Sequence, residues 1–192
     1  MTLEAVAAGT TLYVEGMPAT RVIYVVAGFV GLWRGAEEER GAGVPGLTRR
    51  AGGLLGSEGL AQQEYADTAI TLTDVTICTA ERQRVWCWAT EGTVEAARAV
   101  MEVLIRTQCS EQPRASSAEG TASRRIARWL ADESRGGVGP PIPRAVIAGL
   151  LGMLPETFSR GLATLSARGA IAVNRKEIRV IDPERLLREA GG

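Results

Sequence analysis

The stretch from residue 142 to residue 180 constrains the fold of this chain more than any other part of its sequence. Apolar residues recur at helical spacing from Pro143 to Leu151, which predicts a short helix. Gly152 follows, and a residue without a Cβ suits a tight turn between two helices. A second helix is predicted from Pro155, whose fixed φ suits a first helical turn, to Gly169, which suits the position after the last turn.

A two-stranded hairpin is predicted directly after the second helix. The segments Ala170 to Val173 and Glu177 to Val180 alternate in the manner of strands and enclose a polar turn. The order helix, glycine turn, helix, hairpin is typical of a winged helix-turn-helix. Such a domain binds DNA or another protein, and both functions stay open at this point.

The second predicted helix also has a polar outward face. Glu156, Ser159 and Arg160 lie at i, i+3 and i+4, so they project side by side from its first turns. Arginine can donate two hydrogen bonds to the O6 and N7 atoms of guanine, glutamate accepts from the N4 of cytosine, and serine can bond either base. These three residues are therefore predicted to read bases in the major groove. The alternative is a solvated helix face with a Glu156–Arg160 pair.

Four further residues are assigned to the DNA backbone, because cations and hydroxyl groups bond phosphate oxygens. Two of them are the basic residues of the hairpin turn, and the full set is Thr157, Arg175, Lys176 and Arg144. Contacts of this kind would position the second helix on DNA without reading its sequence.

The charge distribution supports a nucleic-acid partner for the C-terminal part. The whole chain of 192 residues has 22 basic and 22 acidic residues, a net charge of zero. Residues 121–192 contain 12 basic and 7 acidic residues, a net charge of +5, and the remaining 10 basic and 15 acidic residues give −5. A basic DNA-binding part joined to an acidic partner domain shows this asymmetry.

Several kinds of site are excluded by composition. The chain contains no histidine, which excludes a histidine-ligated haem and histidine-based catalysis. Its three cysteines, Cys78, Cys87 and Cys109, form no C-x-x-C pair and are expected to be small buried apolar residues. We therefore expect no catalytic residue, metal or cofactor. No apolar run approaches about 20 residues and no signal-peptide pattern is present, so we expect a cytoplasmic protein without a membrane partner.

The N-terminal half is predicted to be all β. Short runs rich in β-branched and aromatic residues indicate strands at 10–14, 21–33, 54–55, 69–72 and 75–78, with a charged exposed loop at 35–46. From Thr93 the apolar residues change to helical spacing, which predicts one long helix that ends near Gln112. Its apolar positions cover more than one face, so we expect it to pair with a second copy of the chain. Packing on its own domain alone is the alternative.

The remaining segments connect these parts. Trp86 and Trp88 are expected to lie in the core or to pack between the β domain and the long helix. Residues 115–120 are small and polar, which is typical of a hinge. Further helices are predicted over 122–133 and from Asp182 to Arg188.

The C-terminal part resembles the DNA-binding domain of the CRP/FNR family, the regulators related to the catabolite activator protein and the fumarate–nitrate reduction regulator. The matching residues are Ile147-Ala148, Leu151-Gly152, Glu156 to Arg160, Leu165, Gly169, Ile171, Ile178 to Pro183 and Leu186. The form Glu-Thr-x-Ser-Arg is more similar to the fumarate–nitrate branch, which implies a TTGA-like half-site. Segments 11–16 and 23–30 are similar to the opening of the family's sensor domain.

The resemblance implies an α+β fold with three parts. These are a jelly-roll β-barrel similar to cyclic-nucleotide-binding domains (1–90), a dimerisation helix with the start of a hinge (91–114), and a winged helix-turn-helix domain (115–192). The expected protein is a sequence-specific transcription regulator that binds an inverted repeat as a homodimer and contacts RNA polymerase. A protein-binding winged helix and a regulator gated by an unidentified small ligand in the barrel are the alternatives. An enzyme is not expected, because no nucleophile–base or clustered carboxylate pattern is present.

The position that binds the cyclic phosphate in relatives has changed. Family members hold cyclic nucleotides with a Gly-Glu-Leu and an Arg-Ser-Ala segment, to which Gly56–Leu60 and Asp67–Ala69 correspond here. Asp67 thus stands in place of the arginine that would bond the phosphate, and a carboxylate repels it. We expect DNA binding that does not depend on cyclic AMP, and Glu58 to be a surface residue.

Overall fold

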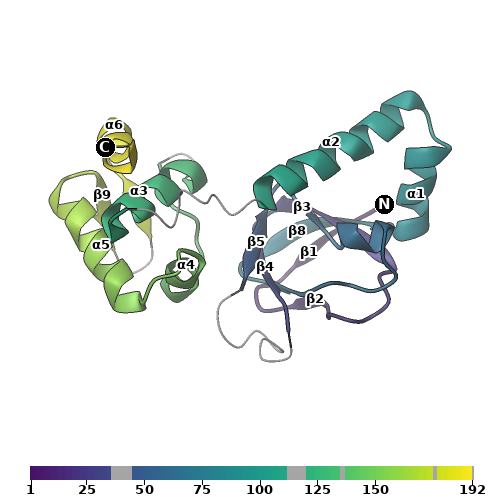
Figure 1. Cartoon of the computed structure of the whole chain (residues 1–192), viewed down its shortest axis with the longest axis horizontal. Coiled ribbons are helices and arrows are strands. Elements are labelled where there is room, and N and C mark those ends of the chain that lie inside the picture. Colours follow the sequence, from purple (N-terminus) through teal and green to yellow (C-terminus); the bar gives the residue numbers. More distant parts are fainter. Residues whose placement is uncertain (36–44, 112–119, 135–136, 175–176, 192) are drawn as a thin grey trace. The chain divides into compact units, whose positions relative to one another are not determined.

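The computed structural model describes residues 1–35, 45–111, 120–134, 137–174 and 177–191, with only the backbone for 109–111. The chain divides into two compact units, residues 1–112 and 113–192. One unit is built mainly of strands and the other mainly of helices, which confirms the predicted α+β class (Figure 1). Most of the predicted loop 35–46 and of the predicted hinge 115–120 lies outside the described residues.

Two four-stranded antiparallel sheets form the N-terminal unit. One sheet has the order β1-β8-β3-β6, made of β1 (Thr2–Val6), β8 (Val75–Glu81), β3 (Arg21–Ala27) and β6 (Leu54–Leu55). The other has the order β2-β7-β4-β5, made of β2 (Thr11–Tyr13), β7 (Thr68–Thr71), β4 (Phe29–Trp33) and β5 (Leu47–Arg50). The chain crosses repeatedly between the sheets, as the predicted jelly-roll arrangement requires.

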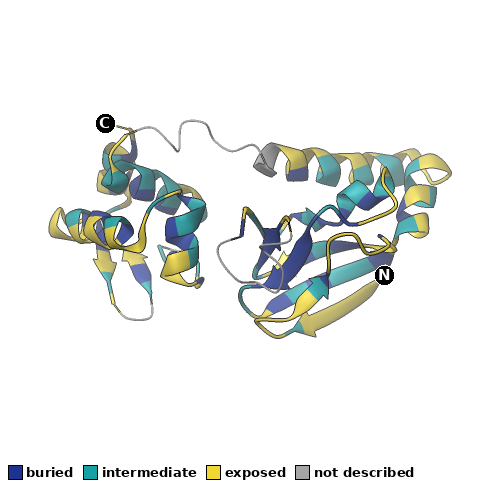
Figure 2. Ribbon diagram, turned by 60° about the horizontal axis from the view of Figure 1, so that its bottom comes forward, coloured by how far each residue is buried: buried dark blue, intermediate teal, exposed yellow. Residues whose placement is uncertain are grey.

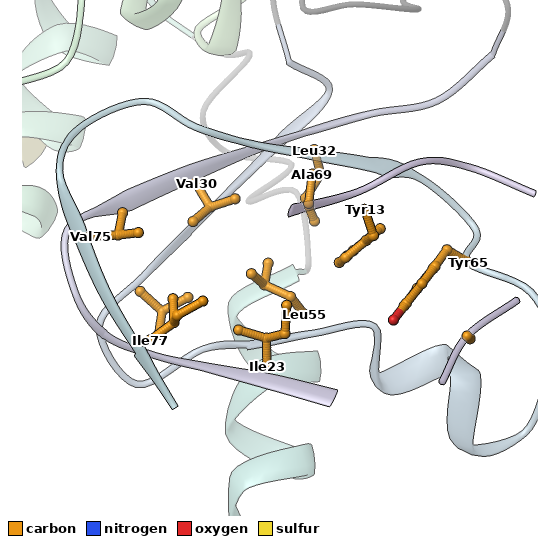
Figure 3. Packing of buried hydrophobic residues seen from close by; sticks show 11 residues of the cluster. Tyr13, Ile23, Val30, Leu32, Leu55, Tyr65, Ala69, Val75 and Ile77 are labelled. Atoms are coloured by element: carbon orange, nitrogen blue, oxygen red, sulfur yellow. The ribbon is translucent and has the colours of Figure 1, made fainter. Parts of the chain in front are cut away.

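The core of this unit joins the inward faces of both sheets. Side chains such as Val25 on β3, Val30 on β4 and Ala69 on β7 are fully buried, because alternate residues of a strand point to the same face. Figure 3 shows the cluster, with Tyr13 and Tyr65 side by side at one end of it. The two tyrosine rings are stacked, with their centroids 3.9 Å apart.

Some elements of this unit differ from the prediction. Strands β1 and β5 were not expected from the sequence, because each packs only one half-buried apolar side chain on the core, Val6 and Leu47. Strand β1 is otherwise an exposed edge strand, and β5 buries Arg49. The segment before the long helix forms another helix, α1 (Arg82–Thr90). The expectation for Trp86 is wrong, since 54% of it is exposed, whereas Trp88 packs against a cluster around Val85 as predicted. Helix α1 lacks a regular apolar stripe, so its periodicity did not reveal it.

The long helix α2 (Val94–Glu111) is confirmed and packs one side on the sheet formed by β1, β8, β3 and β6. Val100 contacts the cluster around Val22, and the buried hydroxyl of Thr107 accepts a hydrogen bond from Leu54 N at 3.1 Å. Figure 2 shows an exposed stripe along the rest of this helix. The stripe includes large apolar side chains.

Four helices and a hairpin form the described part of the C-terminal unit. They are α3 (Ala122–Glu133), α4 (Arg144–Leu150), α5 (Pro155–Ala167), β9 (Ile171–Val173), β10 (Ile178–Val180) and α6 (Pro183–Gly191). Helix, glycine turn, helix and hairpin thus follow one another as predicted. Ile126, Leu130, Phe158 and Leu165 are almost fully buried and hold the helices together.

Candidate nucleic-acid interface

Helices α4 and α5 are joined by a tight turn at Gly152. This glycine has a φ of +59°, a left-handed conformation that a side chain would strain. The amide of Met153 donates to the carbonyl oxygen of Ala148 at 2.9 Å, which ends α4 and turns the chain into α5. On the other side, α5 packs closely on α3, because Gly161 leaves room for the side chain of Ile126. Buried Phe158, Leu162 and Leu165 therefore face inward, and the opposite side of α5 is presented to solvent.

The three predicted base-reading residues lie together on that outer side. Glu156, Ser159 and Arg160 are all exposed on the first turns of α5. The Nε atom of Arg160 donates to the backbone carbonyl oxygen of Glu156 at 3.4 Å, which lays the arginine along the helix toward its N-terminus. Within the described residues, no ion pair joins the side chains of Glu156 and Arg160, and both are exposed to solvent.

The predicted backbone-contacting residues fall into different environments. Thr157 is half-buried at the start of α5, while Arg175 and Lys176 lie outside the described residues. Arg144, at the start of α4, is exposed and its guanidinium donates to the carbonyl oxygen of Asn174 in the hairpin. Arg144 is thus brought next to the hairpin turn. This contact joins two segments that the sequence places 30 residues apart.

The hairpin turn is held by its own polar contacts. Asn174 and Glu177 form three hydrogen bonds with one another. Glu177 N donates to Asn174 Oδ1 at 2.8 Å, Asn174 N donates to Glu177 O at 3.0 Å, and Asn174 Nδ2 donates to Glu177 Oε1 at 3.5 Å. Arg179 pairs with Glu177 at 2.7 Å. These contacts join the two strand ends on either side of the turn.

Leu154 is an exposed residue of this surface that the sequence analysis missed. It is the N-cap of α5, where a serine, threonine, aspartate or asparagine would bond a free backbone N–H group, and it makes no such bond. About 70% of this apolar side chain is exposed, directly before the first turn of α5. An apolar residue at a helix N-cap could have indicated a binding residue in the sequence, since it lowers helix stability without filling the core.

The N-terminal unit has a second polar cluster at the position that corresponds to a nucleotide site. Asp67 is buried, and its Oδ1 accepts a hydrogen bond from the hydroxyl of Tyr13 at 3.0 Å. Glu58 lies on a short 3-10 turn, η2 (Ser57–Leu60), and its Oε1 accepts from the amide of Ala66 at 3.4 Å. Glu58 is therefore half-buried and bonded, which differs from the simple surface residue that was expected.

Burial makes this cluster sensitive to protonation. It raises the pKa of Asp67 to about 6, and repulsion from the Glu58 carboxylate adds to the increase. Burial also raises the pKa of the Tyr13 hydroxyl well above its usual range, with the charge of Asp67 as the next cause. The hydroxyl therefore stays protonated and acts as a donor to Asp67. The charges of Arg34 and Arg49 act in the opposite direction and lower the pKa of Asp67, so two carboxylates and two guanidinium groups lie in this region.

Tyr65 packs against the cluster of Tyr13, Asp67 and Glu58. Its ring is stacked on Tyr13, and its hydroxyl donates to the carbonyl oxygen of Arg21 at 3.0 Å. The positive φ of Gly56, at +67°, lets the chain pass the Tyr65 ring, where a Cβ would lie 2.7 Å from its Cε1 atom. The two rings and these hydrogen bonds join η2 to β2 and β3.

Neither a metal-binding cluster nor a membrane-spanning helix is found among the described residues. In the described part of the chain, no group of three or more cysteine, aspartate or glutamate side chains could hold a metal ion. Cys78 and Cys87 are free and half-buried. None of the helices within the described ranges is long and apolar enough to cross a membrane.

The arrangement of both units matches known protein families. The sequence profile of the Crp-like helix-turn-helix domain matches residues 124–189, and that of the cyclic nucleotide-binding domain matches residues 3–86. No match was found among curated protein sequences. A nucleotide-binding-type β domain followed by this helix-turn-helix domain defines a DNA-binding transcription regulator.

Solved structures with the same fold support this class. FixK2 from Bradyrhizobium japonicum is 22% identical, with a TM-score of 0.81 over 100% of this chain and 98% of that chain. TTHB099, a CRP-family transcriptional regulator from Thermus thermophilus, is 25% identical, with a TM-score of 0.77 over 98% of this chain and 97% of that chain. The chain belongs to the CRP/FNR family of transcription regulators.

Proposed function

We propose that this regulator binds an inverted DNA repeat as a homodimer, and that binding does not require cyclic AMP. The observation that carries the proposal is the exposed face of Glu156, Ser159 and Arg160 on the first turns of α5, the helix that follows the glycine turn of a Crp-like domain. In helix-turn-helix proteins these turns of the second helix enter the major groove. Arg160 then pairs with a guanine, and Glu156 accepts from a cytosine of the opposite strand.

Further contacts follow from the surroundings of this face. Thr157 lies on the same turns of α5, and Arg144 contacts Asn174 at the hairpin; both are proposed to bond phosphate oxygens, together with Arg175 and Lys176 of the hairpin turn. Leu154 extends the face with an apolar group, for which the C5-methyl group of thymine is the matching partner in the major groove. Thymine next to guanine agrees with the TTGA-like half-site that the resemblance implies. RNA polymerase is the expected protein partner of a regulator bound in this way.

The homodimer is supported by the outer side of α2. Val94, Met101 and Ile105 are 81%, 58% and 54% exposed, although all three are large apolar residues. At 100° per residue they fall within about 40° of one another around the helix axis, so they form one stripe. The spacing of seven and four residues is that of helices that pair along an apolar seam. A second copy of α2 is the proposed occupant of this stripe.

Independence from cyclic AMP is supported by the cluster around Asp67. A bound cyclic phosphate would meet the buried carboxylate of Asp67, with Glu58 close enough to raise its pKa. At neutral pH both carboxylates repel an anion, and Arg34 and Arg49, whose charges also reach Asp67, offset part of this repulsion. The stacked rings of Tyr13 and Tyr65 pack against the same place.

Selection of bound duplexes from a random DNA library with the purified protein tests the proposed function. The expected result is an inverted repeat whose half-site centres lie about 10 base pairs apart, because the two-fold axis of the dimer must match that of the DNA. Enrichment in the absence of any nucleotide, unchanged by added cyclic AMP, is expected. A protein-binding winged helix would enrich no sequence.

A further inference from the structure

A hollow of about 870 Å³ lies in the C-terminal unit, at the end of α5 opposite to Leu154. It is lined by the start of α3, the residue after α5, and the outer side of α6. The main lining residues are Thr121, Ser123, Arg124, Arg168, Arg185 and Arg188. Among the described residues that line it, Glu189 is the only acidic one, so four arginines and one glutamate give a formal charge of +3. None of these lining residues is aromatic or a large apolar one.

Three of these arginines are held in place by the protein itself. Arg168 pairs with Glu189 at 2.5 Å. Arg185 donates to the carbonyl oxygen of Arg168 at 2.6 Å and pairs with Asp182, outside the lining, at 3.7 Å. Arg124 donates through Nε to the carbonyl oxygen of Ala190 at 3.3 Å. A guanidinium group has more N–H donors than these contacts use. The three groups are therefore positioned before any ligand arrives, and each retains donors for one.

Arg188 differs from the other three. It is exposed on the last turn of α6 and, among the described residues, it makes no hydrogen bond or ion pair. Its charge adds to a site that is already positive, so it repels its neighbours in the absence of an anion. An anion in the hollow would remove this repulsion.

We infer that this hollow binds a small ligand with two or more adjacent phosphate groups. The planar guanidinium fork matches phosphate oxygens with two parallel hydrogen bonds, and several forks converge here. The hydroxyl groups of Thr121 and Ser123 bond one another at 3.1 Å, which leaves one O–H of the pair as a further donor. The volume is in the range of small-molecule sites and exceeds what one phosphate fills. Because no aromatic ring is found among the described lining residues, the phosphate chain is recognised, and a base is not.

The hollow is separate from the proposed DNA-reading face. Helix α5 has 13 residues and is therefore about 20 Å long, with Leu154 before its first residue and Arg168 after its last. A duplex read by the N-terminal turns of α5 does not need the hollow for its base contacts. The proposed ligand thus binds a different part of the same unit, and the inference does not depend on which sequence the protein reads.

Isothermal titration calorimetry of the full-length protein with inorganic pyrophosphate and with orthophosphate tests the inference. Pyrophosphate is expected to bind more tightly than orthophosphate. Arg188→Gln should weaken pyrophosphate binding by about tenfold, because it removes one charge-assisted contact to the ligand and leaves the other arginines in place. Glu189→Gln should strengthen it, because the carboxylate of the lining is lost. If Arg188 and Glu189 only stabilised the fold, the two substitutions would not change the affinity for pyrophosphate in opposite directions.

Arg98→Gln is the matched control, since Arg98 is an exposed arginine of the N-terminal unit. The affinity of this variant for pyrophosphate should equal that of the unchanged protein. Two results overturn the inference: no binding of pyrophosphate at millimolar concentration, or equal affinity of Arg188→Gln and the unchanged protein. If Arg188→Gln instead lowers the affinity for every duplex and leaves pyrophosphate binding unchanged, the inference is wrong and the hollow is a DNA-backbone contact.

Discussion

Leu154 shows how a single residue can indicate a function. At the N-cap of α5 it leaves the helix without a side-chain cap and exposes an apolar group to water. Either effect alone would favour a polar residue at this position. A contact with thymine gives a reason for leucine, because the C5-methyl group is the apolar feature of the major groove.

Replacing Leu154 with serine is expected to change stability and DNA binding in opposite directions. The hydroxyl would cap α5, so the free energy of unfolding of the C-terminal unit should rise by about 0.5–2 kcal/mol in urea. At the same time the variant should lose discrimination between thymine and deoxyuridine, which differ only by the methyl group.

Deoxyuridine in place of the contacted thymine should lower the affinity of the unchanged protein by a few-fold, as the loss of about one buried CH₂ does. It should leave the affinity of Leu154→Ser unchanged. Leu187→Ala is a matched control, because Leu187 is also exposed but lies on α6. Equal sensitivity to deoxyuridine in Leu154→Ser and the unchanged protein would argue against the thymine contact.

Asp67 gives a prediction on pH. Its folded-state pKa of about 6 lies above the unfolded value of about 3.9, so the folded state favours the protonated acid. The buried carboxyl group of Asp67 therefore contributes fully to the free energy of unfolding below about pH 4, where it is protonated in both states. This contribution is lost as the pH rises through about 6 and the folded-state group ionises. Asp67→Asn should therefore raise the free energy of unfolding at pH 8 by about 1–3 kcal/mol and have little effect at pH 4.

Urea unfolding of Asp67→Asn at both pH values measures this difference. Asp74→Asn is the control, since Asp74 is exposed and accepts from the amide of Ala8. A gain of the same size at pH 4 and pH 8 would show that the carboxyl does not titrate between them.

These residues also show what could be predicted from the sequence. The place of Asp67 followed from its position in a recognisable segment. The contacts of Tyr13 and Tyr65 could not be predicted, because they come from strands and turns 52 positions apart that only the fold brings together. Arg144 was assigned to DNA from its charge, whereas its bond to Asn174 depends on how the hairpin packs.

At the scale of elements, the close crossing of α3 and α5 depends on Gly161. A Cβ atom there would lie 2.5 Å from the Cδ1 atom of Ile126, which is fully buried. Gly161→Val should therefore destabilise the C-terminal unit by about 1–3 kcal/mol, the usual cost of overpacking.

Thermal and urea unfolding would measure this cost, with Ala163→Val as the control. Ala163 is exposed on the same helix, so valine there should cost only the small difference in helix propensity. A Gly161→Val protein as stable as Ala163→Val would show that the two helices can move apart freely.

The exposed stripe on α2 gives the second prediction for an element. Ile105→Arg would place an unpaired charge in the proposed seam, which should raise the dimer dissociation constant by at least about 100-fold. Sedimentation velocity of the variant should show monomers at concentrations where the unchanged protein is dimeric.

Ala99→Arg should leave the dimer intact, because Ala99 is exposed but turned by about 120° from Ile105 around the helix. A well-folded dimer in Ile105→Arg would place the seam elsewhere. The periodicity of the sequence predicted this helix and its length. The direction of its free side could not be predicted, since that depends on which residues contact the sheet, such as Val100 and Thr107.

At the scale of the whole molecule, the charge asymmetry follows the division into two units. The sequence from residue 121 carries a net charge of +5, and the preceding part carries −5. The two compact units divide at residues 112 and 113, close to that change of sign. A basic unit that approaches DNA and an acidic unit that avoids it would together orient the protein on the duplex.

The order of the parts could be predicted because each has its own periodicity: alternation in the strands, helical spacing in α2, and the helix–glycine–helix pattern after it. Helix α1 and strands β1 and β5 were missed for the opposite reason, since packing rather than a local pattern determines them. Local patterns and packing also differ in this way at the two proposed binding sites. The face of α5 is a local pattern, whereas the arginine hollow joins three segments.

The affinity of Arg160→Ala for matched and single-base-changed operators, measured at two salt concentrations, tests the central claim most directly. If Arg160 reads a guanine, the variant should lose about 1–3 kcal/mol per half-site on the matched operator and no longer discriminate at that base. The salt dependence of binding should change little, whereas Lys176→Ala should weaken all operators alike and reduce the salt slope. An equal loss of affinity of Arg160→Ala for every operator, with a smaller salt slope, would show that Arg160 holds phosphate and does not read the sequence.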